Sequence, residues 1–290
     1  MKAGFVSILG EPNVGKSTLL NRLVGLKLAG VSRKPQTTRQ VIRGILTEPR
    51  GQIVFMDTPG LHKPKDALGR FMVREAAGTL PDADLIYFMT EPSVPQEAAL
   101  SVLERFRDGP KAVFCLINKV DSVSKPEILP VIGWYKDHWP FREIIPISAR
   151  QGDQVDLVLE KTFEGLPEHE PYFPSDMASD QTERFITGEI IREKIFRFTG
   201  QEIPYATAVE IEEFKEEEKI TRIHAVIFIE KESQKAIVIG AGGKKLKEIG
   251  VEARKDLERF LGKQVFLKLW VKVLKDWKRD ERALKRFGFQ

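Results

Sequence analysis

The sequence predicts an α/β domain with a mostly parallel sheet, followed by a smaller α+β domain. Apolar strand-like runs alternate with helical patterns over the first half of the 290 residues, which is typical of a parallel sheet with helices on both faces. Three prolines between residues 167 and 174 then interrupt the periodicity. Beyond them the order becomes helix, strand, strand, helix, glycine turn, helix, strand, and this change indicates a second domain.

Ligands of a parallel sheet bind at the carboxyl ends of its strands, so the strand ends are where a site is expected. The strand candidates of the first domain are residues 5–9, 53–56, 85–89, 112–117 and 143–147. Helical patterns separate them at 17–26, 66–80, 96–107 and 127–137, and a further one at 154–165 closes the domain. Each polar motif of the first domain lies at a strand end or in the loop after it.

A loop that can hold phosphate lies between the first expected strand and the first expected helix. It consists of Gly10, Glu11, Pro12, Asn13, Val14, Gly15, Lys16 and Ser17. Its glycines let backbone N–H groups turn toward an anion, and the positive end of the helix dipole adds to the attraction. The Lys16 ammonium can reach the outer phosphates, and the Ser17 hydroxyl can bind Mg²⁺. A short pattern of this kind also occurs by chance, so the other motifs decide.

Two further stretches can complete a Mg²⁺ and phosphate site. The second strand is followed directly by Asp57, Thr58, Pro59 and Gly60. A carboxylate there can hold the Mg²⁺ shell while the Gly60 N–H faces a terminal phosphate, although the four residues alone would indicate an ordinary turn. A polar loop at 32–40 contains two threonines, and we expect Thr38 rather than Thr37 to complete the Mg²⁺ shell.

A motif for guanine follows the fourth strand, in the form of Asn118, Lys119 and Asp121. Guanine carries N–H donors on one edge that a carboxylate accepts in pairs, whereas adenine would leave the acceptors of Asp121 unpaired. Asn118 and Lys119 would brace the loop and cover the base. A weaker motif after the fifth strand can offer a backbone N–H to the guanine oxygen and consists of Ser148, Ala149 and Arg150.

With these motifs, residues 2–166 resemble the guanine-nucleotide-binding domain of the translation-factor-like GTPases. The resemblance implies binding of GTP and GDP, a Mg²⁺ cofactor, hydrolysis to GDP and phosphate, and switching of loops 32–40 and 57–77. It gives catalytic roles to Lys16, Thr38 and Gly60. Leu61 stands where Ras-like relatives carry the glutamine that orients the attacking water, so we expect slow hydrolysis. Asn13 resembles an asparagine that ligates K⁺ in some bacterial GTPases, and both a K⁺ site and a plain loop role stay open for it.

Composition narrows the remaining functions. No run approaches the roughly 18 apolar residues of a membrane span, and the N-terminus enters a strand pattern without room for a signal peptide. The single cysteine, Cys115, lies in an apolar run and is expected to be buried. These features indicate a cytosolic protein.

The charge is unevenly distributed along the chain. Residues 240–290 hold 15 Lys/Arg and 7 Asp/Glu, a balance of +8, whereas the whole chain has a net charge of +4 and the remainder therefore −4. A segregated basic part favours nucleic acid over lipid as a partner.

The second domain is expected to hold its ligand at a glycine turn. A helix at 181–198, capped by Asp180, precedes strands at 207–213 and 220–229 and a short helix at 233–239. The turn that follows is Gly240, Ala241, Gly242 and Gly243. Lys244, Lys245 and Lys247 lie in the first turn of the next helix, where each opposes the helix dipole at a cost of about 0.3–1 kcal/mol. An anionic ligand would offset that cost. A strand at 265–273 and an aromatic-rich tail end the chain.

This order resembles the helix-first (type II) K-homology RNA-binding domain, whose groove beside the turn takes about four unpaired nucleotides. We therefore divide the chain into a GTP-binding domain at 1–166, a linker at 167–180 and a type II K-homology domain with its tail at 181–290. The whole chain resembles the Era family of bacterial GTPases, notably at 35–39, 238–244 and 270–273. Ala241 stands where many relatives carry lysine, which weakens one expected phosphate contact.

Membership of that family implies a role in maturation of the small ribosomal subunit, the 30S particle. The implied partners are GTP or GDP and the single-stranded 3′ end of the small-subunit ribosomal RNA, for a protein expected to be a monomer. Peripheral contact with the cytoplasmic face of the membrane is also left open. A signalling GTPase whose basic domain binds protein or anionic lipid is the alternative. A P-loop kinase is a weaker one, because it gives no reason for Asn118 and Asp121.

Overall fold

The computed structural model describes residues 1–32, 34–61, 64, 66–93, 104, 111–200 and 203–289. They form two compact units, each with its own sheet. The first unit comprises Met1–Leu28, Thr38–Lys63 and Met72–Asp180. The second comprises Ala29–Thr37, Pro64–Phe71 and Gln181–Gln290. Among the helices that the structure describes, none combines the length and apolarity that crossing a bilayer demands.

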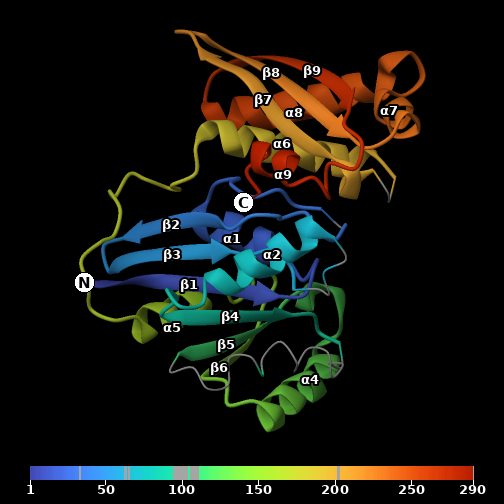
Figure 1. The fold of residues 1–290 in the computed structure, drawn as a ribbon. Helices are drawn as coiled ribbons and strands as arrows, with labels where there is room; N and C mark the ends of the chain where they lie inside the picture. Colours follow the sequence, from blue (N-terminus) through green and yellow to red (C-terminus); the bar gives the residue numbers. More distant parts are fainter. Residues whose placement is uncertain are drawn as a thin grey trace. The chain divides into compact units, whose positions relative to one another are not determined.

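The first unit is built on a six-stranded sheet with strand order β2-β3-β1-β4-β5-β6 (Figure 1). The strands are β1 (Lys2–Gly10), β2 (Ile42–Glu48), β3 (Gly51–Asp57), β4 (Leu85–Thr90), β5 (Ala112–Ile117) and β6 (Glu143–Pro146). All neighbours are parallel except β2, which runs antiparallel to β3. Every residue of β3 is buried, as expected for a strand covered on both faces. The mostly parallel α/β architecture predicted from the sequence is confirmed.

Strand β2 was not among the expected strands. It lies at the edge of the sheet, and Gly44 in its middle weakens the strand pattern. The glycine is required by packing, because a Cβ there would lie 2.7 Å from side-chain carbons of Leu20 and Val24. Because the first helix packs so closely against the sheet, this position has to be glycine, and the sequence lacks the apolar side chain that would have predicted a strand.

Helices of the first unit connect the strands and supply the rest of its core. They are α1 (Lys16–Val24), α4 (Lys125–His138) and α5 (Val155–Gly165), and α2 (Ala67–Gly78) begins in a segment of the second unit. Val131 and Tyr135 of α4 pack into a cluster with buried residues of the sheet, among them Cys115. Burial raises the pKa of the Cys115 thiol. The helix expected at 96–107 lies outside the described residues, apart from the helical Glu104.

The proline-rich stretch follows the surface of the first unit. The Gln52 amide donates to the carbonyl of Phe173 at 2.8 Å and accepts from the backbone N–H groups of Tyr172 and Phe173 at 2.8 and 3.0 Å. The backbone of Ala3 donates to Pro167 at 3.2 Å. These contacts hold the stretch along its length.

Asp180 is not the cap of the next helix, so that expectation was wrong. Its carboxylate pairs with Arg43 at 2.7 Å. Helix α6 (Glu183–Phe198) begins three residues later, and the Thr182 side chain caps it by accepting from the backbone N–H of Phe185 at 3.2 Å. Thr182 stands directly before the helix, the place from which a side-chain oxygen reaches the first free N–H groups.

The second unit has a three-stranded sheet, β7-β8-β9, with β7 antiparallel and β9 parallel to β8 (Figure 1). Its elements after α6 are β7 (Ala208–Glu216), β8 (Ile220–Ile229), α7 (Glu232–Ile239), α8 (Lys244–Leu261), β9 (Gln264–Val273) and α9 (Glu281–Arg286). Buried residues of α6 and α8, such as Ile190 and Leu257, form the core with alternate residues of β8. The tail docks through Trp277, which is fully buried and donates from Nε1 to the carbonyl of Ala206 at 2.9 Å.

Candidate nucleotide site and RNA-binding turn

The loop between β1 and α1 has the backbone of an anion cradle. Gly10 and Gly15 have φ values of 149° and 105°, and Asn13 has a φ of 68°. A Cβ on Gly15 would lie 2.2 Å from Nδ2 of Asn118, so no other residue fits there. Because Gly15 is the N-cap of α1 and offers no side chain, the first amides of the helix remain available to an anion.

Lys16 places a buried positive charge inside this loop. Its Nζ donates to the carbonyls of Gly10 at 3.1 Å and Glu11 at 2.8 Å. Burial lowers the pKa of Lys16 to about 8, while the charges of Asp57 and Glu11 act in the opposite direction. An ammonium that is removed from water and surrounded by carbonyl oxygens interacts strongly with a phosphate placed beside it.

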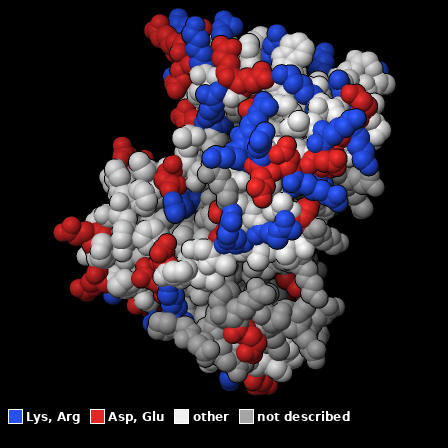
Figure 2. Space-filling model, in the orientation of Figure 1, with Lys and Arg blue, Asp and Glu red and all other residues white. Residues whose placement is uncertain are grey.

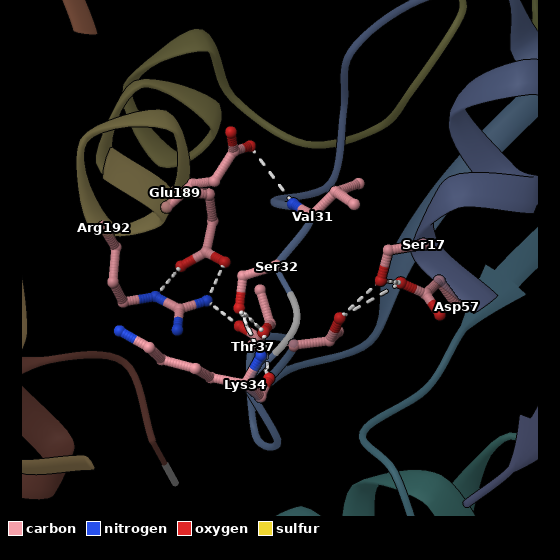
Figure 3. A network of polar contacts seen from close by, with 10 residues as sticks. Ser17, Val31, Ser32, Lys34, Thr37, Asp57, Glu189 and Arg192 are labelled. Carbon is pink, nitrogen blue, oxygen red and sulfur yellow. Dashed lines mark hydrogen bonds and ion pairs between the residues drawn. The ribbon is translucent and has the colours of Figure 1, made fainter. Parts of the chain in front are cut away.

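Three oxygen ligands for a divalent ion converge at the start of α1. The Ser17 hydroxyl lies 2.6 Å from Oδ2 of Asp57 and 2.8 Å from the Thr38 hydroxyl, which is itself 3.2 Å from the same carboxylate oxygen (Figure 3). The Thr37 hydroxyl instead bonds to Ser32 at 2.9 Å and to the Lys34 carbonyl at 2.7 Å. Two hydroxyls and one carboxylate suit Mg²⁺, because this ion usually takes only a few ligands from the protein and completes its shell with water and phosphate oxygens. Within the described residues, no cluster of three or more His, Cys, Asp or Glu side chains could hold a metal ion.

Gly60 brings the end of β3 against the phosphate loop. A Cβ at Gly60 would lie 2.7 Å from the Cα of Pro12, so the backbone comes close only because a side chain is missing. The Leu61 N–H donates to the Gly10 carbonyl at 3.1 Å, and its side chain packs against the apolar cluster of the sheet. Leu61 therefore offers no group to orient a water molecule.

The expected base-reading residues lie together at the ends of β5 and β6. Asn118 donates from Nδ2 to the Val14 carbonyl at 2.7 Å and accepts from the Ala149 N–H at 2.8 Å. The Asp121 carboxylate accepts from the Ser148 hydroxyl at 2.7 Å. Asn118 thus joins the phosphate loop to the loop after β6.

Two further residues support the loops after β5 and β6, and the sequence motifs did not include them. Arg22 of α1 donates from Nε to the Ala149 carbonyl at 2.6 Å and from its other end to the carbonyl of Arg150. Glu91 pairs with Lys119, whose backbone is left-handed with a φ of 68°. Neither residue belongs to a recognisable spacing, since each reaches the loop only in the folded sheet.

The glycine turn of the second unit is exposed and open. Gly240, Gly242 and Gly243 have φ values of 72°, 57° and 78°. A Cβ on Gly242 or Gly243 would meet nothing within 4 Å, so the turn leaves room for a ligand backbone. Lys244 and Lys247 are exposed in the first turn of α8. That turn contains no acidic residue. On the face seen in Figure 2, basic and acidic side chains of the second unit are mixed.

Two segments of the expected switch loops belong to the second unit. Arg192 of α6 pairs with Glu189 and donates to the Thr37 carbonyl (Figure 3). Lys34 donates to the carbonyls of Phe196 and Thr199 at the end of the same helix, and the Val31 N–H donates to Glu193 at 3.1 Å. Phe71 packs against Phe289 of the tail, with ring centres 5.6 Å apart. Thr38, which directly follows Thr37, instead bonds to Ser17 and Asp57 in the nucleotide site.

Comparison with known proteins gives matches over both units. Residues 5–119 match a family described as 50S ribosome-binding GTPase, and residues 202–278 match the KH domain. GTPase Era of Geobacter metallireducens is 49% identical over 99% of this chain and 98% of its own. GTPase Era of Coxiella burnetii is 47% identical over the same shares of the two chains.

Two solved structures cover 100% of this chain and 99% of their own, each with a TM-score of 0.96. One, 40% identical, is a variant of Aquifex aeolicus Era bound to GDP and AlF4⁻. The other, 41% identical, is Era in complex with MgGDPNP and nucleotides 1506–1542 of 16S ribosomal RNA.

Proposed function

Because this chain belongs to the Era family of GTPases, we propose that it is a GTP-hydrolysing switch that binds the 3′ end of small-subunit ribosomal RNA during assembly of the 30S subunit. The observation that carries the proposal is that a guanine-nucleotide site and an open glycine turn flanked by lysines lie on one chain. An Era relative has been solved with both kinds of ligand, MgGDPNP and 16S ribosomal RNA. The match to the KH domain argues against the lipid- or protein-binding alternative.

In this proposal each motif has one task. The amides of residues 10–17 and the Lys16 ammonium hold the phosphates, and Asp121 with the loop at Ser148 reads the guanine edge. Ser17, Thr38 and Asp57 would hold Mg²⁺, and the Asp57 carboxylate already accepts from both hydroxyls. When bound, Mg²⁺ neutralises charge on the phosphates. The Gly60 N–H would hold the terminal phosphate.

Activation by K⁺ is proposed for Asn13, because Leu61 leaves the attacking water without a side chain to orient it. A monovalent cation beside the phosphate loop would neutralise charge that develops in the transition state. We expect GTP turnover to be several-fold faster in KCl than in NaCl of equal ionic strength, and Asn13→Ala and Asn13→Asp to change that ratio. Equal rates in both salts for all three proteins would leave Asn13 as a loop residue only.

RNA binding at the glycine turn is tested with Gly242→Asp. The new carboxylate would repel the sugar–phosphate backbone, so we expect at least a tenfold loss of affinity for single-stranded RNA from the 3′ end of 16S ribosomal RNA at fixed salt. Gly133→Asp adds the same charge on α4 of the first unit, where a Cβ also meets nothing, and should leave affinity unchanged. GTP turnover should survive in both variants. Unchanged RNA affinity in Gly242→Asp would favour the protein- or lipid-binding alternative.

The nucleotide is proposed to control RNA access as a timer. Residues 29–37 bond to α6 of the second unit while Thr38 bonds to Ser17 and Asp57, so an event at the terminal phosphate acts on a segment held by the RNA-binding unit. GTP would order this loop, and hydrolysis would release it.

We expect RNA affinity to differ by about fivefold or more between the GDPNP and GDP forms. Lys34→Met, which removes the bonds to Phe196 and Thr199 but keeps the aliphatic stem, should reduce that ratio. Lys136→Met, an exposed change on α4, should not. Equal affinities of the wild-type protein in the two nucleotide forms would rule out the timer while leaving RNA binding intact.

Ribosome assembly places the protein in the cytoplasm in this proposal, with any membrane contact peripheral. The protein is proposed to act as a monomer.

A further inference from the structure

The outer face of the second unit's sheet carries two exposed aromatic rings. Residues of β9 alternate, so that Val265 and Leu269 face the helices and Phe266, Lys268 and Trp270 face away from them. The Phe266 side chain is 44% exposed and that of Trp270 is 51% exposed. Contact between a large aromatic ring and water is unfavourable. Two such rings exposed on one face of one strand therefore indicate a surface that binds a ligand.

Part of this face is already covered by the chain itself. Phe228 of β8 packs against Phe287 of the tail, with ring centres 5.1 Å apart, and the Arg286 guanidinium lies 5.0 Å from the same ring. Phe228 is buried beneath these contacts, and Val226 of the same strand is buried as well. The tail thus covers Phe228 on the neighbouring strand, whereas Phe266 and Trp270 stay exposed.

Cations accompany both open rings. The Lys268 Nζ lies 4.9 Å from the centre of the Trp270 ring, and the Arg222 guanidinium lies 5.5 Å from that of Phe266. Strand β9 contains two lysines and no acidic residue. The carboxylates near this face come from β7 and its turn, and each has a cationic or histidine partner: Glu213 pairs with His224 at 2.9 Å, Glu217 with Arg222 at 3.1 Å, Glu212 with Lys272 at 3.1 Å and Glu210 with Arg286 at 2.6 Å.

We propose that the outer face of β9, formed by Phe266, Lys268 and Trp270, is a second RNA-binding surface on which unpaired bases stack. Flat rings accept any base by stacking, and a lysine between them suits the intervening phosphate. Four residues along a strand separate the two rings by about 13 Å, which leaves room for two separate stacking positions. Strand β9 is at the edge of its sheet, so one RNA strand can pass from the helix side of the unit to this face. The inference rests on the proposed RNA-binding function and extends it beyond the glycine turn.

The test uses the full-length protein and nested single-stranded RNAs from the 3′ end of 16S ribosomal RNA. One RNA has about four nucleotides, enough for the groove at the turn. Two others of about ten nucleotides extend it on the 5′ or the 3′ side, within the range that stacking surfaces occupy. Phe266→Val and Trp270→Val remove the rings but keep residues that favour a strand. Each should weaken binding of one of the long RNAs by about tenfold and leave the short RNA unaffected.

Tyr172→Val is the matched control, since Tyr172 is a 39% exposed aromatic residue of the first unit. GDP binding and circular dichroism show whether each variant is folded. A second readout does not depend on a loss of affinity. The fluorescence of Trp270, taken as the difference between wild type and Trp270→Phe, should be quenched by a long RNA and not by the short one.

Two outcomes separate this inference from the function on which it rests. If Gly242→Asp abolishes binding while the β9 variants bind the long and short RNAs like the wild type, the second surface is overturned and the RNA-binding function stands. If the wild-type protein retains none of the RNAs at low salt, both are overturned.

Discussion

Asp121→Asn is expected to change the purine preference from GTP to xanthosine triphosphate. The Asp121 carboxylate can accept both N–H donors of guanine, while Ser148 fixes its orientation with a hydrogen bond of 2.7 Å. Asparagine replaces one acceptor by a donor, which opposes the guanine amino group and matches the oxygen that xanthine carries in its place. Mismatched polar groups in such a site discriminate by about 10⁴-fold, so the ratio of kcat/KM for the two nucleotides should reverse.

The measurement is a comparison of kcat/KM for GTP and xanthosine triphosphate in wild type and variant. Asp137→Asn on α4 makes the same chemical change at an exposed position and should leave the preference for GTP in place. If Asp121→Asn still selects GTP, another residue reads the guanine edge.

Lys194→Met is expected to destabilise the second unit by about 3–5 kcal/mol, because it removes the buried cation shared by two carboxylates, which keep the Val31 N–H and the exposed Arg259 as weaker partners. Lys194 of α6 is 3% exposed, and its Nζ donates to Glu193 at 3.1 Å and to Asp256 of α8. Desolvation lowers the pKa of Lys194, but its bonds to Asp256 and Glu193 outweigh this and the pKa is raised. The pair therefore stabilises the folded unit below the ordinary lysine pKa and loses that effect only at more alkaline pH.

Amide hydrogen exchange of α6 and α8 measures this effect locally, which matters because a chain of two units need not unfold in one step. Lys161→Met is the control, since Lys161 pairs with Glu164 at 2.9 Å on the surface and such pairs contribute about 1 kcal/mol or less. Unchanged protection of α6 and α8 in Lys194→Met would show that the two carboxylates do not depend on the lysine.

Local sequence signals predicted the fold where they act over few residues. The glycine loop, the strand ends and the order of elements in the second unit all depend on short-range patterns, and the structure shows these elements. Strand β2 was missed because packing against α1 places Gly44 at its centre. The Asp180 cap failed because Arg43, far away in the sequence, takes the carboxylate.

Residues that act across the fold gave no local signal. Arg22 supports the base loop from the end of α1, and its position in a helix looks like that of any surface arginine. The assignment of residues 29–37 and 64–71 to the second unit depends on contacts with α6 and the tail, which a linear pattern does not contain. Such residues become visible only when the sheet and the helices bring distant segments together.

The hydrogen bonds around Gln52 change what kind of connection joins the two units. Pro167, Phe173 and Ala178 accept hydrogen bonds from the first unit, so this stretch is not a flexible linker, whatever its proline content. The flexible part of this connection is therefore limited to the residues between Asp180 and the start of α6, and the chain also passes between the units at 28–29, 37–38, 63–64 and 71–72.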